Sequence, residues 1–168
     1  LGEALAKVGR LEEATAAFRQ AVTINPQSAW PLYRLGELLS QQNQLEEAVD
    51  YIHKAIDSET NVPSFYLCLG IALVKLERWS EAEKYLEKVI QFSSNCVAQI
   101  DTQTNDYPNQ IPTAYQAEAY YNLGKAKSGQ QKWSEAVELY RQSWDLKPTI
   151  DCCLNLGVVL EKLEQWSE

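Results

Sequence analysis

Residues 63–89 read PSFYLCLGIALVKLERWSEAEKYLEKV, and two apolar helical patterns lie on either side of a short corner within this stretch. Gly70 follows a leucine in the first pattern, and Ala82 lies early in the second. The same arrangement occurs 34 residues earlier around Gly36, and 34 residues before that around Gly2. A fixed period of this length in helical sequence predicts an array of helix–turn–helix repeats.

The glycine of each repeat falls in mid-helix, where glycine costs roughly 0.5–1 kcal/mol relative to alanine. A residue that recurs at this cost indicates close packing against the second helix of its pair. The small contact residues are Gly2, Gly36, Gly70, Ala14, Ala48 and Ala82, and the large residues near the corners are Leu11, Leu45 and Trp79. Small residues at one contact and large ones at the next predict a single register for each helix pair.

Charge and hydropathy limit the function. The chain of 168 residues has 15 Lys and Arg against 23 Asp and Glu, a formal net charge of −8. Such a surface repels phosphate backbones and anionic lipid, so we expect no nucleic-acid partner and no binding to a membrane surface. No apolar run approaches the ~20 residues of a membrane span, and no secretory leader occurs, so we expect a cytoplasmic location without membrane insertion.

The four cysteines, Cys68, Cys96, Cys152 and Cys153, show no CxxC pair and no His–Cys spacing of a zinc site. The adjacent Cys152 and Cys153 point roughly 100° apart on a helix, which suits joint coordination of one metal poorly. We therefore expect the cysteines to be small buried residues of a protein in a reducing compartment. We expect neither a bound metal nor a cofactor.

The period divides the chain into repeats. We predict helices at 11–24, 29–42, 45–57, 113–128, 133–145 and 150–163, a third pair starting at Pro63, and the opening of one more helix at 165–168. These give repeats at about 1–28, 29–62, 63–92, 117–149 and an incomplete 150–168. Neither end carries a polar cap, so we expect a segment of a longer array.

The period breaks once, because Gly70 and Gly124 are 54 residues apart. The excess of 20 residues falls at about 93–112, a polar stretch that predicts an inserted loop. A passive loop and an ordered lid over the array are both open at this point, since the insertion carries the apolar residues Val97, Ile100, Tyr107 and Ile111.

These residues resemble the tetratricopeptide repeat, a 34-residue helix–turn–helix unit. The resemblance covers the chain except the insertion. Its helix glycine is matched by Gly2, Gly36, Gly70, Gly124 and Gly157, and its first alanine of the second helix by Ala14, Ala48, Ala82 and Ala136. Val89, Lys127 and Ser143 depart from the pattern. The strings RWSEAE, KWSEAV and QWSE resemble bacterial arrays.

The resemblance implies an all-α, right-handed superhelical solenoid of antiparallel helix pairs. Its first helices would line a concave groove that binds a peptide or helix of another protein. The groove positions that the resemblance carries over include Trp30, Tyr33, Glu37, Leu67, Ile71, Val74, Tyr121, Lys125 and Leu154. Arg34 and Asn122 fall near positions that clamp a terminal carboxylate in some members, but the matching Lys and Asn neighbours are missing.

No catalytic motif occurs, and His53 lies among polar residues on a second helix, which is typical of a solvated surface residue. We therefore predict a protein-interaction scaffold and no enzyme. Two alternatives stay open. The array could recruit substrate or drive oligomerisation in a larger bacterial enzyme, such as a glycosyltransferase, methyltransferase or sulfotransferase. It could also be a structural module that self-associates through its uncapped ends.

Overall fold

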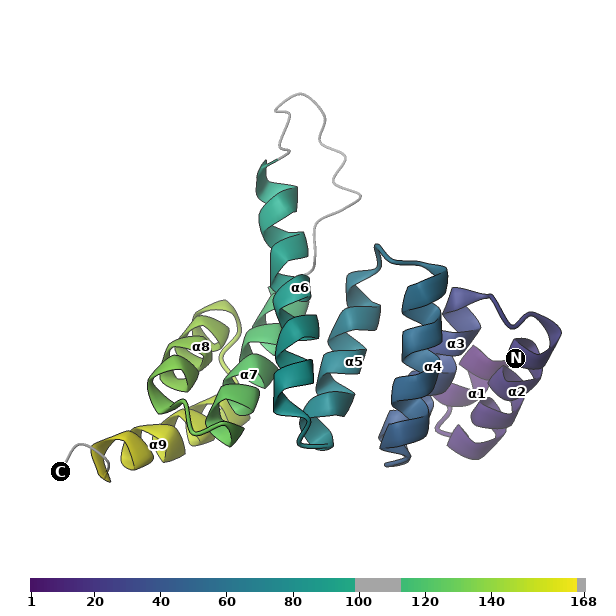
Figure 1. The fold of residues 1–168 in the computed structure, drawn as a ribbon. Coiled ribbons are helices and arrows are strands. Elements are labelled where there is room, and N and C mark those ends of the chain that lie inside the picture. The colour runs from purple at the N-terminus through teal and green to yellow at the C-terminus, as the bar shows by residue number, and fades with distance from the viewer. Residues whose placement is uncertain (99–112, 166–168) are drawn as a thin grey trace.

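The computed structural model describes residues 1–98 and 113–165, with side chains placed within 1–92 and 113–164. The described residues form α-helices and no strand. The helices are α1 (Gly2–Lys7), α2 (Leu11–Ile24), α3 (Ala29–Gln41), α4 (Leu45–Ser58), α5 (Pro63–Lys75), α6 (Trp79–Ala98), α7 (Thr113–Gly129), α8 (Trp133–Leu146) and α9 (Ile150–Gln165). They follow one another as antiparallel pairs along an open array (Figure 1). The predicted all-α solenoid is confirmed.

The helix ends agree with the predicted ones to within two residues, except at the C-terminus of α6. This helix continues to Ala98, six residues into the stretch that we assigned to a loop, and rises beyond its neighbours (Figure 1). The physical reason is that the polar residues after Phe92 include no helix breaker before Pro108. The rest of the predicted insertion and residues 166–168 lie outside the described residues.

Each corner between paired helices contains one residue in the left-handed conformation. These residues are Gly9, Asn43, Glu77 and Gln131, with φ of 79°, 63°, 59° and 61°. The next residue closes each helix end by a bond to a carbonyl five residues back, as from Arg78 N to Leu73 O at 3.0 Å. Only the first corner uses glycine, which adopts this conformation without steric cost. The same turn therefore recurs on four different sequences.

Four of the five repeated glycines, Gly2, Gly36, Gly70 and Gly124, receive a large side chain from the partner helix, as predicted. A Cβ added to Gly36 would lie 2.5 Å from the side chain of Ile52. At Gly70 the corresponding distance to Leu86 is 2.6 Å. Because van der Waals contact needs more space than this, any larger residue at these two positions would push the helices apart.

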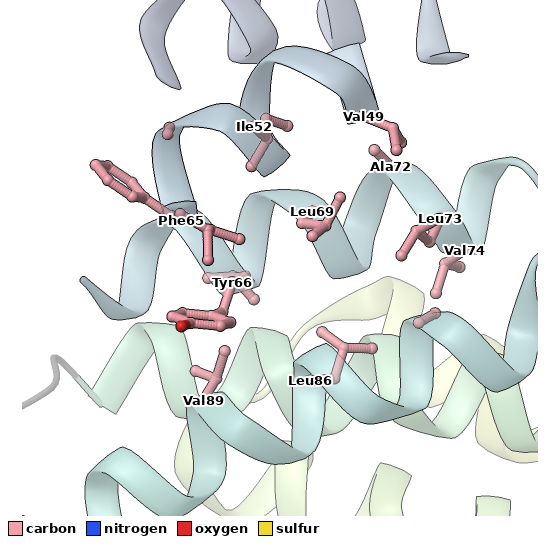
Figure 2. Close-up of a cluster of buried hydrophobic side chains, with 14 of the residues drawn as sticks. Val49, Ile52, Phe65, Tyr66, Leu69, Ala72, Leu73, Val74, Leu86 and Val89 are labelled. Carbon is pink, nitrogen blue, oxygen red and sulfur yellow. The ribbon is translucent and has the colours of Figure 1, made fainter. Parts of the chain in front are cut away.

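The central core surrounds α5, whose Phe65, Leu69 and Leu73 have no exposed surface. Figure 2 shows these side chains between those of α4, such as Ile52, and those of α6, such as Leu86. Helix α5 is apolar on most of its circumference because it contacts α3, α4, α6 and α7. It is therefore the most enclosed helix of the array.

The curvature of the array follows from which of its helices lie close to one another. The backbones of the first helices α3, α5, α7 and α9 approach one another in turn, whereas the backbones of successive second helices stay further apart. Among the second helices only side chains meet, as in the ion pair of Arg19 on α2 with Glu47 on α4. The first helices are therefore crowded on an inner face, and the second helices α2, α4, α6 and α8 are splayed on an outer face.

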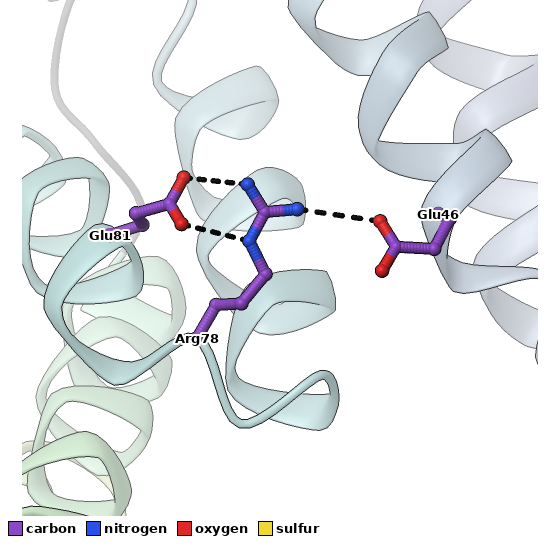
Figure 3. Close-up of polar contacts among 3 residues, drawn as sticks. All are labelled: Glu46, Arg78 and Glu81. Carbon is purple, nitrogen blue, oxygen red and sulfur yellow. Dashed lines mark hydrogen bonds and ion pairs between the residues drawn. The ribbon is translucent and has the colours of Figure 1, made fainter.

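Ion pairs join successive repeats on the outer side. The guanidinium of Arg78 binds both carboxylate oxygens of Glu81, at 2.7 and 2.8 Å, and reaches Glu46 of the preceding repeat at 3.3 Å (Figure 3). The hydrogen bonds from Arg78 lower the pKa of the Glu81 carboxyl. These groups are solvated, so the contacts align the repeats and add little stability.

Candidate functional site

An aromatic cluster lies on the inner face, where the N-terminal halves of α3 and α5 meet. The rings of Tyr33 and Phe65 stack with centroids 4.8 Å apart. The ring of Trp30 meets both edge-on, 5.7 Å from Tyr33 and 5.6 Å from Phe65. Edge-on and stacked pairs each add about 0.5–1.5 kcal/mol beyond simple burial. The cluster therefore holds the Trp30 indole in one orientation.

The exposure of the cluster is uneven. Trp30 keeps 53% of its surface exposed, whereas Tyr33 is 9% exposed and Phe65 is fully buried. A large aromatic side chain that is fixed from behind and open in front offers contact area at low entropic cost. Trp30 is thus the principal exposed aromatic contact of the predicted groove, and Tyr33 supports it.

The predicted apolar centre of the groove is mostly core. Leu67 and Val74 are 5% and 3% exposed because α5 packs against α7 as well as α3. Ile71 is partly buried and keeps some open surface on the same helix. Leu67 and Val74 therefore offer almost no contact area, and we leave them out of the proposed contact surface.

A polar set on α3 borders the aromatic cluster. The guanidinium of Arg34 is ion-paired with Glu37, and the Tyr33 hydroxyl donates to the same carboxylate at 3.4 Å. The Nε–H of Arg34 is buried and has no acceptor among the described residues. A buried donor left without a partner costs about 1–3 kcal/mol. Arg34 therefore has a buried donor without a partner, one helical turn after Trp30 along α3.

Cys68 of α5 lies near the charged groups of the inner face. Burial raises the pKa of its thiol to about 12, assisted by the carboxylates of Glu37 and Glu118 and opposed by Lys75 and Arg34. The thiol therefore stays protonated at neutral pH and is a poor nucleophile.

A second exposed region lies on α7 and α9. The Nζ of Lys125 lies 5.8 Å from the ring centroid of Tyr121, within range of a cation–π contact. Asn155 of α9 donates to the Tyr121 hydroxyl at 2.9 Å, which fixes that ring between the two helices. Leu154 is 63% exposed. Of the predicted groove residues, Tyr121 and Lys125 thus lie together on α7, and Leu154 is an exposed side chain of α9.

Two charged features lie outside the set of predicted site residues. Glu118 of α7 has no ion pair among the described residues; burial raises the pKa of its carboxyl, and the charge of Lys147 opposes that shift. Lys127 departs from the apolar pattern, yet it is 8% exposed and ion-paired with Glu83 of α6 and Glu135 of α8. The sequence signal for the Lys127 ion pairs was a lysine at a position that is usually apolar. Its partner Glu83 lies 44 residues away in the sequence, so the spacing did not identify it.

In the described part of the chain, no group of three His, Cys, Asp or Glu side chains is placed so that it could hold a metal ion. His53 lies edge-on to Tyr85, with centroids 5.5 Å apart, on the outer helices. None of the described helices combines the length and apolar character needed to cross a membrane.

Comparison with known families agrees with this architecture. One tetratricopeptide repeat model matches residues 5–67, and a second matches residues 64–93 and 116–147. The chain belongs to the tetratricopeptide repeat family. No curated protein matches the chain.

Solved structures of such repeats share the fold. MamA 41-end from Desulfovibrio magneticus RS-1 aligns with a TM-score of 0.78 at 22% identity, over 97% of this chain and 81% of that one. YrrB, described as a TPR protein with an unusual peptide-binding site, aligns with a TM-score of 0.72 at 23% identity, over 97% and 74%. The first TPR of Spaghetti (RPAP3), bound to the HSP90 peptide SRMEEVD, aligns with 0.65 at 21% identity, over 82% and 94%. These similarities show the tetratricopeptide repeat fold and leave the ligand of this chain open.

Proposed function

We propose that this tetratricopeptide repeat array is a protein-interaction scaffold that binds a partner peptide or helix across its inner face. The contact surface comprises the residues Trp30, Ile71, Tyr121, Lys125 and Leu154, with Tyr33 and Glu37 as supports. The peptide-binding sites of YrrB and RPAP3 support a ligand of this class. The same surface would serve substrate recruitment if the array belongs to a larger enzyme.

The single observation that carries the proposal is the exposed, immobilised Trp30. Its indole is more than half exposed, although two neighbouring rings hold it in place. A bound segment that covers the indole removes this apolar surface from water at little entropic cost.

The test compares two tryptophans. Trp30→Ala removes the inner-face contact, and Trp144→Ala removes a 39% exposed tryptophan from α8 on the outer side. Immobilised wild type and both variants are incubated with a lysate of the source organism, and the retained proteins are identified. We expect a protein that the wild type and Trp144→Ala retain and Trp30→Ala loses, with unchanged circular dichroism. Equal retention by all three would reject the inner face as the binding site.

A second proposal concerns self-association through α9. Ile150, Leu154 and Val158 are 80%, 63% and 55% exposed, and nothing lies within 4 Å of a Cβ added to Gly157. Because α9 is the last helix of the described residues, a second copy of the chain would cover this apolar face by docking on it. Analytical ultracentrifugation of the wild type and a Val158→Ser variant tests this proposal. An apparent molecular mass that rises with protein concentration in the wild type, but not in the variant, supports self-association.

The cysteines support a further proposal about location. Cys68, Cys152 and Cys153 are free thiols. Free thiols persist in reducing compartments, so we propose that the protein works in the cytoplasm.

A further inference from the structure

Helix α9 carries an apolar face that is exposed along most of its length. Ile150, Leu154 and Val158 are spaced four residues apart and therefore lie on one face of the helix. Among the described helices, only α7 and α8 approach the backbone of α9, which lies at the end of the array (Figure 1). The face turned away from these two helices is therefore open to another molecule.

The shape of this face is suited to a helix. In the four preceding repeats the equivalent glycine lies against a large side chain of the neighbouring helix, as Gly70 lies against Leu86 and Gly124 against Tyr140. In the single chain the depression at Gly157 is empty, because none of the described atoms lies within 4 Å of an added Cβ. A helix that brings a large apolar side chain to Gly157 would fill this depression as in the other repeats.

Helix α9 itself carries such a side chain. Leu154 lies less than one turn from Gly157 and is exposed. If two copies of α9 pair in antiparallel orientation about a two-fold axis between these residues, Leu154 of each copy faces Gly157 of the other. Ile150 and Val158 extend the contact to either side. One symmetric arrangement therefore covers the apolar face of both copies.

The charges along α9 favour the antiparallel orientation. Asp151 in the first turn and Lys162 in the last turn are both exposed. They are about three helical turns apart and lie on the same flank of the apolar face. An antiparallel pair therefore places Asp151 of each copy near Lys162 of the other, whereas a parallel pair would place like charges together. The exposed Glu161 would lie near the N-terminus of the second α9, where the helix dipole favours a carboxylate.

We propose that α9 forms the interface of a two-fold symmetric dimer, in which it pairs antiparallel with α9 of a second copy and Leu154 of each copy covers Gly157 of the other. This pairing rests on the self-association proposed above and names the surface of the second copy that takes part. Leu154 is covered in the dimer, so a ligand on the inner face of a dimeric chain would contact Trp30 and Tyr121 and not Leu154.

Two charge-reversal variants test the pairing by analytical ultracentrifugation. Asp151→Lys and Lys162→Asp each bring like charges together twice in an antiparallel homodimer. We expect the dissociation constant of each variant homodimer to be at least about tenfold higher than that of the wild type. An equimolar mixture of the two variants should associate to within about threefold of the wild type, because each new charge then meets its opposite. This recovery would also show that α9 is folded in both variants.

A control variant separates the local contact from net charge. Asp151→Lys and Glu138→Lys, at an exposed position of α8, each replace a negative charge by a positive one and so reduce the net charge of −8 equally. If overall repulsion governed association, both variants would dimerise more tightly than the wild type. We expect weaker association for Asp151→Lys and a change of less than about twofold for Glu138→Lys.

The outcomes separate the pairing from the self-association on which it rests. If the wild type dimerises and Val158→Ser does not, but both charge-reversal variants dimerise like the wild type, association through α9 stands and the antiparallel pairing is overturned. If the wild type stays monomeric at every concentration, or Val158→Ser dimerises as tightly as the wild type, both proposals fail. The inner-face scaffold is tested independently by Trp30→Ala.

Discussion

The ammonium of Lys127 on α7 is bonded to the carboxylate of Glu83 on α6, and these side chains are only 10% and 20% exposed. Gln130 donates to the second oxygen of Glu83 at 3.0 Å, and Glu135 of α8 lies 2.9 Å from Lys127. The third and fourth repeats are therefore joined by a largely buried charge network, at the joint where the sequence period is interrupted.

Removing one member of this pair should destabilise the array. Lys127→Met keeps the apolar stem but leaves Glu83 with Gln130 alone. We expect a loss of roughly 2 kcal/mol in the free energy of unfolding, below the ~3–5 kcal/mol of a fully buried pair because both groups touch solvent. Urea denaturation measures it. The double variant Lys127→Met with Glu83→Met should lose less than Lys127→Met alone, since no unpaired charge remains; a larger loss in the double variant would contradict this account.

The same pair predicts a loss of stability in acid. Burial disfavours the charge on Glu83, but the hydrogen bonds from Lys127 and Gln130 outweigh it and lower the pKa of its carboxyl. A group with a lowered pKa in the folded state stabilises the fold above its unfolded pKa, about 4.3 for Glu, and this contribution disappears as the pH falls through the folded value. The free energy of unfolding should therefore fall below about pH 4.3.

A comparison of variants isolates Glu83 from the other carboxylates in that measurement. Glu83→Gln cannot titrate, so its stability should decline less steeply between pH 6 and 3 than that of the wild type. Glu138→Gln on α8, whose carboxylate is exposed, should follow the wild-type curve. Parallel curves for Glu83→Gln and the wild type would show that the pair does not set the acid limit.

Sequence periodicity predicted the helix pairs because each repeat needs a small residue opposite a large one, as with Gly36 and Ile52. It did not predict the six extra residues of α6, since the polar residues there lack the apolar signal on which the prediction depended. The family pattern assigns Leu67 and Val74 to the groove, and both are buried because α5 packs against α7 as well as α3. The spacing carries no information about long-range pairs such as Lys127 with Glu83.

Two glycines at equivalent positions should respond to alanine with opposite signs. In Gly70→Ala the new Cβ would lie 2.6 Å from the side chain of Leu86, so the core must shift. We expect a loss of about 1–3 kcal/mol, as for overpacking. No second helix lies beside Gly157 among the described residues, so in Gly157→Ala nothing lies within 4 Å of the new Cβ, and alanine favours the helix by up to about 1 kcal/mol. Thermal and urea unfolding of both variants check the signs; two variants that shift stability in the same direction would refute this account.

The acidic peptide SRMEEVD, which the RPAP3 domain binds, should not bind this chain measurably. Arg34 and Asn122 lie nearest to carboxylate-clamping positions, but both are engaged. The guanidinium of Arg34 is ion-paired with Glu37, and the Asn122 amide donates to the carbonyl of Glu118 at 2.8 Å. The free carboxylate of Glu118 adds repulsion of an acidic ligand. Anisotropy titration of labelled SRMEEVD should show no saturable change in the wild type.

Two variants show whether this exclusion is local. Glu37→Gln frees the Arg34 guanidinium, and Glu118→Gln removes the nearby negative charge, so together they should permit weak, salt-sensitive binding of SRMEEVD. Glu87→Gln with Glu138→Gln changes the net charge equally at exposed sites on α6 and α8 and should leave the chain unable to bind it. Tight binding of SRMEEVD by the wild type would contradict this exclusion and would mean that Arg34 exchanges Glu37 for the ligand carboxylate.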